Sequence, residues 1–354
     1  MLSFEDYDEL WARPTGSQAP DLPTGKGTKV IVIDGAFWAE HPAYASTIDN
    51  VWRVPPVPTL PAHQMHGAAV VSLLTAVAPE TKVDYLETRM GWWDNVVFNA
   101  ARLHQGGAVA RDSALYYLSC IKKSGKSLPE WTEIYARNTF LSALYFARDK
   151  ITKGHSVDAV SMSQGWANPQ LLKLQRDTYY PDLKMPAFYW DLKEAFSEKA
   201  FEMLGWFHRQ NIPVFSSCSG LQDLFLCDRS GPLIWTKDKK AELGYLSQIE
   251  KSGSIGLGVA DRRVACFSEK EVRLWRNLFY RSRGGGVSWA IPHLVGMFLL
   301  ARQKAPDMTY AQFAPMVRQS ARMTEFGEGR VLPTVSLEAY GKKLNELPLV
   351  HELS

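Results

Sequence analysis

Cysteines are few in this sequence, and neither sign of charge dominates. The 354 residues include four cysteines, which are Cys120, Cys218, Cys227 and Cys266. They form no CxxC pair and no metal-ligand spacing, so buried, reduced thiols are expected rather than a disulfide framework. The 40 lysines and arginines nearly balance the 37 aspartates and glutamates, which leaves a net charge of only +3. This balance argues against a dedicated nucleic-acid-binding protein.

Long apolar runs are also missing. No window approaches the roughly 18 apolar residues without charge that indicate a membrane-spanning helix. The N-terminal stretch MLSFEDYDELWARP is acidic and amphipathic, unlike the basic and then apolar pattern of a signal peptide. We therefore expect no membrane association and a cytoplasmic location. No feature of the sequence specifies an oligomeric state.

Apolar and aromatic residues, by contrast, are abundant. Hydrophobic residues make up 46% of the chain, with 16 Phe, 14 Tyr and 12 Trp, so a large core is expected and disorder as the main state is excluded. The length suits one large domain or two ordinary ones. Residues 1–28 are rich in proline, glycine and polar residues and predict an irregular N-terminal arm. Residues 29–354 are expected to form a single domain.

Apolar runs and helix-spaced segments alternate along this domain. Lys29–Gly35 (KVIVIDG) is apolar before its Asp-Gly end, as in a central parallel strand buried on both faces. Gly67–Ala78 is apolar without turn residues, which favours a buried helix. The other expected strands are 82–87, 157–162, 212–216, 254–259 and 264–267, and the other expected helices are 131–150, 197–210, 287–304 and 310–322. Repeated helix-then-strand units predict an α/β fold with a mainly parallel central sheet and helices on both faces.

Three polar residues lie at the ends of these elements. Asp34 ends the first strand, where open α/β sheets carry functional groups, although Asp-Gly after a strand is commonly just a turn. His66 precedes the first buried helix, where a cap or a satisfied core histidine is the usual alternative. Ser288 follows the glycines 284–286 and enters an apolar helix. Free backbone N–H groups at such a position stabilise an oxyanion, and a simple N-cap serine is the alternative.

The segments around these three residues carry further patterns. Segment 30–42 (VIVIDGAFWAEHP) is an apolar strand that ends in Asp and is followed by His-Pro. Segment 66–83 (HGAAVVSLLTAVAPETKV) begins with His-Gly and runs on to Ala-Pro. Segment 284–302 (GGGVSWAIPHLVGMFLLAR) is close to Gly-Thr-Ser-Met-Ala-x-Pro-His-Val-x-Gly. In this order the three segments resemble the aspartate, histidine and serine segments of the subtilisin-like serine peptidases.

The resemblance extends over most of the chain. Segments 157–166 (VDAVSMSQGW) and 212–220 (IPVFSSCSG) resemble the two strands that line the family's substrate cleft. Segment 256–269 (GLGVADRRVACFSE) resembles the late strand pair that precedes the serine loop. The landmarks follow the family order from Val30 to about Arg302, so the resemblance implies a subtilisin-like three-layer architecture.

The resemblance also implies a catalytic triad. Ser288 would be the nucleophile, His66 the general base, and Asp34 the carboxylate that orients the imidazole. The backbone N–H of Ser288 would supply one oxyanion donor. His63 is a competing histidine, but it lacks the following glycine of the family motif and ranks well behind His66.

A second set of residues would bind a protein or peptide substrate. Ser163, Gln164 and Gly165 would align it as an additional strand beside the cleft. Trp166 stands where the family commonly has glycine at the mouth of the specificity pocket. Its indole either narrows that pocket or packs on the cleft wall.

The main departure from the family is the second oxyanion donor. The family presents an Asn side chain, whereas this chain has Ser216–Gly220 (SSCSG), in which Ser219 is the candidate replacement. Loss of such a donor lowers the rate about 10²–10³-fold. We therefore expect slow, selective cleavage.

Other departures concern loops. The calcium-binding loop that many family members carry before Ala78-Pro79 is missing, and no Asp-rich calcium pattern occurs elsewhere. We therefore expect no cofactor and no metal, and a structural calcium ion has no support. Two insertions are predicted, at about 91–154 and 168–195. The second holds the aromatic stretch Thr178–Trp190 and directly follows a cleft strand, so it is expected to border the active site.

These observations predict a selective intracellular serine endopeptidase with a Ser-His-Asp acyl-enzyme mechanism. The alternative is a catalytically weak or inactive pseudoenzyme on the same fold that acts as a peptide-binding module, which the missing Asn and Trp166 favour. A third reading is that residues 1–28 occupy the cleft and inhibit the enzyme.

Overall fold

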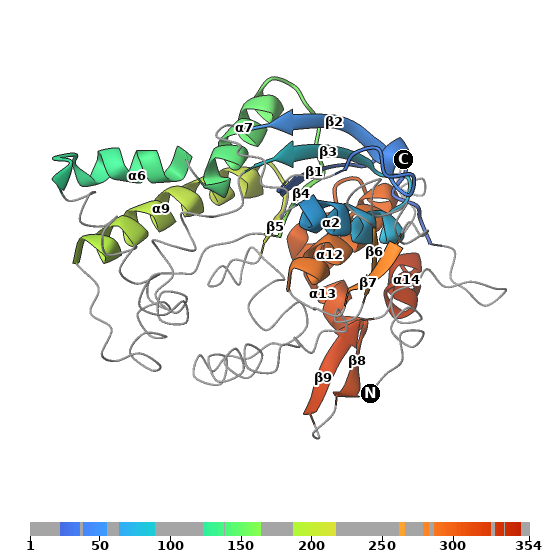
Figure 1. Ribbon diagram of the computed structural model, residues 1–354. Coiled ribbons are helices and arrows are strands. Elements are labelled where there is room, and N and C mark those ends of the chain that lie inside the picture. Colours follow the sequence, from blue (N-terminus) through green and yellow to red (C-terminus); the bar gives the residue numbers. More distant parts are fainter. Residues whose placement is uncertain are drawn as a thin grey trace.

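The core of the protein is a five-stranded parallel sheet in the order β2-β3-β1-β4-β5 (Figure 1). The structure is a computed structural model that describes residues 22–35, 38–54, 64–88, 123–137, 139–163, 187–216, 262–265, 279–282, 287–326, 330–335 and 337–347. The strands of the sheet are β1 (Lys29–Asp34), β2 (Ile48–Arg53), β3 (Lys82–Glu87), β4 (Ala159–Met162) and β5 (Val214–Ser216). The predicted α/β class with a mainly parallel sheet is confirmed.

The central strand β1 is buried on both faces of the sheet. Val30 and Val32 belong to one buried cluster, whereas Ile31 and Ile33 belong to the other. Successive side chains of a strand point to opposite faces, so a continuous apolar run is what this position requires. The run at 29–34 thus has the structure that its sequence predicts.

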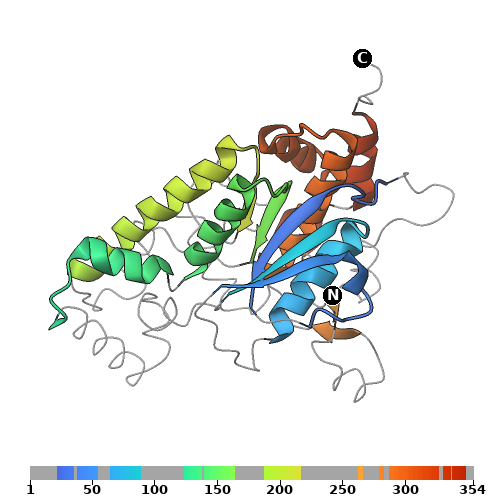
Figure 2. The same cartoon turned by 90° about the horizontal axis from the view of Figure 1, so that it is seen from above.

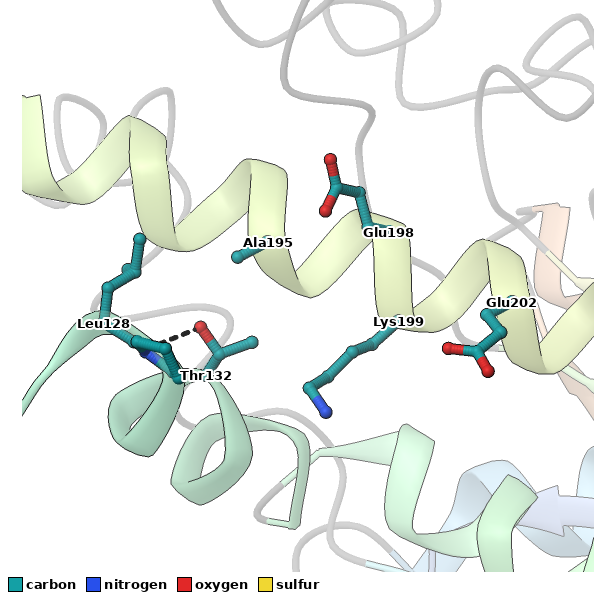
Figure 3. Close-up of a pocket in the computed structure, with 7 residues that line it drawn as sticks. Leu128, Thr132, Ala195, Glu198, Lys199 and Glu202 are labelled. Atoms are coloured by element: carbon teal, nitrogen blue, oxygen red, sulfur yellow. Dashed lines mark hydrogen bonds between the residues drawn. The ribbon is translucent and has the colours of Figure 1, made fainter.

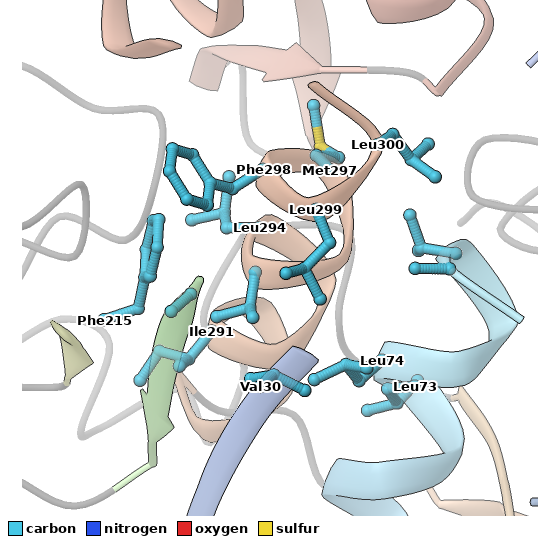
Figure 4. Packing of buried hydrophobic residues seen from close by; sticks show 14 of the residues in the cluster. Val30, Leu73, Leu74, Phe215, Ile291, Leu294, Met297, Phe298, Leu299 and Leu300 are labelled. Atoms are coloured by element: carbon cyan, nitrogen blue, oxygen red, sulfur yellow. The ribbon is translucent and has the colours of Figure 1, made fainter. Parts of the chain in front are cut away.

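The first helix layer covers the face of the sheet toward which Val30 and Val32 point. It consists of α2 (Gln64–Val77), α12 (Val287–Lys304), α13 (Tyr310–Gln319) and α14 (Leu337–Asn345). Figure 4 shows side chains of α2 and α12 meeting Val30 and Phe215. The helix predicted at 287–304 has the observed bounds of α12, and the helix predicted at 310–322 ends earlier, because β8 begins at Ala321.

The second helix layer covers the opposite face. It consists of α6 (Leu128–Arg137), α7 (Phe140–Thr152) and α9 (Ala187–Arg209). Figure 2 shows the strands between the two helix layers. Helices on both faces are therefore confirmed. The helix predicted at 197–210 begins earlier, at Ala187.

The prediction of one helix over 131–150 is wrong, because two helices lie there. Thr139 has an extended backbone (φ −126°, ψ −177°), and its hydroxyl accepts a hydrogen bond of 3.3 Å from the N–H of Leu141. A threonine in this geometry caps the start of a new helix. The apolar spacing continues across the break, so periodicity alone did not detect it.

The edge strand β2 was not predicted. Its side chains are alternately half-buried and exposed, and its sequence IDNVWR is polar at several positions. Polar contacts attach it to the sheet: the Asn50 amide donates to Asp84 Oδ1 at 2.6 Å, and Lys29 Nζ donates to Asp49 Oδ2 at 2.6 Å. His155 contacts the other oxygen of Asp84. With exposed positions at every second residue and polar side chains among its contacts, β2 gives only a weak apolar signal.

Two antiparallel strand pairs lie outside the central sheet. They are β6 (Arg262–Ala265) with β7 (Phe279–Ser282), and β8 (Ala321–Phe326) with β9 (Arg330–Val335). β6 overlaps the strand predicted at 264–267, whereas the strand predicted at 254–259 lies outside the described residues. β7, β8, β9 and the helix α14 were not predicted. The predicted arm and insertions remain predictions.

Helices α2 and α12 approach each other closely at Gly296. A Cβ atom on Gly296 would lie 2.7 Å from Val77 Cβ and 3.1 Å from the carbonyl oxygen of Leu74. We predict that Gly296→Ala lowers the free energy of unfolding by about 1–3 kcal/mol, because it overpacks this contact. Urea denaturation measures the change. Gly205→Ala in α9 is the matched control, since its Cβ would meet only the flexible end of Arg209 at 3.3 Å. An equal loss in both variants would contradict the prediction.

Candidate active site

Asp34 and His66 form a hydrogen-bonded pair at the carboxyl edge of the sheet. The Asp34 side chain is fully buried, and His66 Nδ1 lies 2.9 Å from each of its carboxylate oxygens. The backbone N–H of Gly35 donates to Asp34 Oδ1 at 2.7 Å. A carboxylate only accepts hydrogen bonds, so the proton of the imidazole is on Nδ1. Nε2 is then the basic nitrogen.

Two opposing effects act on the pKa of His66. Burial lowers it, because the charged imidazolium loses hydration, whereas the charge of Asp34 and the hydrogen bond to it raise it. The net result is a pKa above the usual value of 6.5. Asp34 therefore both orients the ring and stabilises its protonated form, as a general base needs.

A buried tyrosine fixes the turn that follows Asp34. The Tyr85 hydroxyl of β3 donates to the carbonyl oxygen of Gly35, and the N–H of Thr88 donates to the carbonyl oxygen of Asp34 at 2.8 Å. Burial and then the charge of Asp34 raise the pKa of Tyr85 well above 10.0, so the phenol stays neutral and keeps its proton for this bond. Sequence reasoning missed Tyr85. The signal was available, because a tyrosine in a buried run needs a partner for its hydroxyl.

Ser288 lies at the same edge of the sheet, in the first turn of α12. Its hydroxyl donates to the carbonyl oxygen of Ser163 at 3.3 Å, and the hydroxyl of Ser163 donates to the carbonyl oxygen of Ser288 at 3.0 Å. Ile33 of β1 pairs with Met162 of β4, so the next residues, Asp34 and Ser163, lie on adjacent strands at the carboxyl edge. This register places the serine segment beside the Asp34–His66 pair.

The predicted site residues thus divide into two groups. The structure brings Asp34, His66, Ser163 and Ser288 to one edge of the sheet. Gln164, Gly165, Trp166, Ser219 and His63 lie outside the described residues, as do the four cysteines, and their roles remain predictions. The first-turn N–H groups of α12 have no intrahelical partners, so Ser288 lies where a negative charge is stabilised.

No three or more His, Cys, Asp and Glu side chains among the described residues are grouped so that they could hold a metal ion. No helix in the same residues is both long and apolar enough to cross a membrane.

Comparison with known proteins found similarity only among solved structures. No family model and no curated protein sequence matches the chain. It is similar to a lanthipeptide protease at 12% identity and TM-score 0.44, with 98% of this chain and 96% of that chain covered. It is also similar to a cold adapted subtilisin-like serine proteinase at 11% identity and TM-score 0.42, with 94% of this chain and 97% of that chain covered. It is similar as well to the prenylagaramide maturation protease PagA at 13% identity and TM-score 0.43, with 91% of this chain and 95% of that chain covered.

These solved structures include a member of the family whose motifs the sequence resembles. With each of these identities below 25% and each TM-score below 0.5, the similarity does not assign a role to any residue. The chemistry of the site therefore rests on the geometry of Asp34, His66 and Ser288.

The pKa of His66 provides a test of the pair that does not depend on activity. NMR titration should give a value above 6.5, and Asp34→Asn should lower it below 6.5, because burial remains while the attraction is lost. Asp49→Asn, which removes a carboxylate at the other end of the sheet, should leave it unchanged. Because the folded-state pKa is raised, the pair stabilises the fold fully below the unfolded pKa near 6.5. This contribution is lost as the pH rises through the folded pKa. An Asp34→Asn value equal to wild type would refute the pairing.

Proposed function

We propose that the protein is a serine endopeptidase in which Ser288 is the nucleophile, His66 the general base and Asp34 the orienting carboxylate. The observation that carries this proposal is the buried Asp34–His66 pair, which keeps Nε2 of His66 basic beside the helix that presents Ser288. Selective processing of proteins or peptides is the expected role, because the sequence lacks the family's oxyanion Asn.

The first chemical step forms an acyl-enzyme. The Ser288 hydroxyl first turns from the Ser163 carbonyl toward Nε2 of His66, which needs rotation about one side-chain bond. Catalytic hydrogen bonds of this kind commonly tighten only when substrate binds. Oγ then bonds to the scissile carbonyl carbon while its proton passes to Nε2. The N–H groups at the start of α12 stabilise the negative oxygen that develops.

The second step releases the two products. The imidazolium gives its proton to the leaving amine nitrogen as the C–N bond breaks, and the acyl group stays on Ser288. A water molecule then attacks the ester, with His66 again taking and returning the proton. The three side chains supply nucleophile, base and orienting group, so we propose that the reaction needs no cofactor. Ser219 as a replacement oxyanion donor, and Gln164, Gly165 and Trp166 as substrate-binding residues, belong to the same proposal.

A fluorophosphonate probe tests this assignment directly. The probe should bond to Ser288 Oγ with loss of fluoride, so Ser288→Ala should abolish labelling. Ser142→Ala is a matched control, because Ser142 also lies in the first turn of a helix and its hydroxyl donates to a backbone carbonyl, that of Thr139, at 2.7 Å. This variant should be labelled like wild type.

The labelling result distinguishes a serine peptidase from an inactive peptide-binding module on the same fold. Labelling that persists in Ser288→Ala would disprove the role of Ser288. A wild-type protein that is never labelled but still binds peptides would favour the peptide-binding module instead.

The pH dependence of labelling provides a second test. His66 accepts the Ser288 proton only when it is neutral, so the labelling rate should fall as the pH drops through the raised pKa of His66. The midpoint of the rate profile should equal the pKa that NMR gives for His66. Asp34→Asn should move the midpoint to lower pH and reduce the rate by about 10⁴-fold, because the tautomer is no longer fixed. A profile that does not follow the His66 titration would exclude it as the base.

A further inference from the structure

A groove lies between the second-layer helices α6 and α9. It has a volume of about 330 Å³, and its apolar wall comes from Leu128, Pro129 and Ala195 (Figure 3). Lys199 of α9 extends between the two helices, and Glu198 and Glu202 stand on α9 at the border of the groove. The groove is thus apolar inside and charged at its border.

The groove is level with the edge of the sheet that holds the candidate active site. α9 leads into β5 and runs antiparallel to it, so Arg209 lies near the amino edge of the sheet. At about 1.5 Å per residue, Ala195 lies about 21 Å along the helix from Arg209. A six-residue strand such as β1 spans about 20 Å. Figure 1 shows α6 and the first half of α9 extending on the side toward which β2 and β3 point.

The charges on α6 are already matched by other groups. Glu133 binds Arg137 at 2.8 Å and Lys199 of α9 at 3.1 Å. Glu130 accepts hydrogen bonds from the backbone and hydroxyl of Ser127 at 2.7 and 2.8 Å, as in a capping box. The ammonium group of Lys199 is therefore occupied, and these carboxylates are not available to a ligand.

The carboxylates of α9 differ from those of α6. Asp191, Glu194, Glu198 and Glu202 are all exposed, and their spacing places them on one face of the helix. Within the described ranges, Glu198 and Glu202 take part in no ion pair. Arg209, near the end of α9, is the one exposed lysine or arginine of this helix on the same face. The face therefore carries four carboxylates and one guanidinium, although the whole chain carries a net charge of +3. A cationic ligand with apolar side chains complements both the border and the wall of the groove.

We propose that the groove between α6 and α9 binds a basic, partly apolar segment of the substrate at a distance from the scissile bond. This inference rests on the proposed peptidase function, for which it names a substrate class. Its ammonium or guanidinium groups pair with Glu198 and Glu202, and its apolar side chains contact Leu128, Pro129 and Ala195. Such a contact selects substrates by a sequence outside the cleft.

Peptide binding to the full-length Ser288→Ala protein tests the proposal. The probe is a fluorescent helical peptide with lysines at i, i+4 spacing and leucines between them, and its partner has glutamates in place of the lysines. Fluorescence anisotropy should show tighter binding of the lysine peptide. The double variant Glu198→Gln, Glu202→Gln should weaken that binding about threefold to tenfold at low salt and less at high salt.

Two further variants of the Ser288→Ala protein complete the design. Glu338→Gln, Glu346→Gln removes two exposed carboxylates that pair with lysines at α14, at 2.7 and 2.8 Å, and should leave binding unchanged. Ala195→Arg fills the groove with a cation and should weaken binding at least as much as the α9 double variant. Circular dichroism checks that each variant folds.

The outcomes separate this inference from the proposed function. Equal binding of the two peptides, or equal effects of the α9 and α14 double variants, would overturn the groove assignment while leaving fluorophosphonate labelling of the wild type untouched. Selective binding of the lysine peptide by a protein that is never labelled would keep the groove and reject the peptidase.

Discussion

The buried carboxylate of Asp34 is the constraint on which the candidate site depends. A buried carboxylate is costly unless its oxygens receive hydrogen bonds or an opposite charge. Here Gly35 donates to one oxygen, and His66 lies within reach of both. The pair exists only while the turn after β1 and the start of α2 keep their places, and the Tyr85 hydroxyl fixes that turn through Gly35. The basicity of His66 thus depends on packing well below the surface.

The helix that carries Ser288 is fixed at two points. In its first turn, two hydrogen bonds link Ser288 to Ser163 at the end of β4. Two turns further on, Gly296 allows Val77 and Leu74 of α2 to approach α12 closely. Because α2 also carries His66, this contact fixes the helix of the proposed nucleophile against the helix of the proposed base. The sheet links Asp34 to the same helix, since the parallel register of β1 and β4 brings Asp34 beside Ser163, to which Ser288 is hydrogen-bonded. Residues from four distant parts of the chain therefore meet at one edge of the sheet.

The sequence predicted the parts of this arrangement that are specified by apolar patterns. β1 and α12 have their expected bounds because they are buried, and their runs leave little choice of structure. β2 escaped prediction because its place depends on the partners of Asp84, which lie far from it in the chain. The same limit applies within the site. Asp34, His66 and Ser288 were proposed as site residues from the residues that flank them, whereas Tyr85 acts through a hydrogen bond to a residue 50 positions away.

The length of α9 shows that it does more than cover the sheet. A six-residue strand spans about 20 Å, and a helix of that length needs about 13 residues. α9 has 23 residues and is therefore longer than the strands that it covers. The remaining turns would lose their packing beyond the sheet, but α6 covers them. Tyr135 of α6 packs against Phe196 of α9, with ring centroids 4.4 Å apart and the rings tilted by 55°, and the buried Lys193 lies over the Tyr135 ring at 5.7 Å. This contact fixes the walls of the groove before any ligand binds. A bound segment would then lose less free energy to ordering its partner than it would on a flexible loop, so even the weak ion pairs of an exposed border would contribute to the proposed selection of substrates.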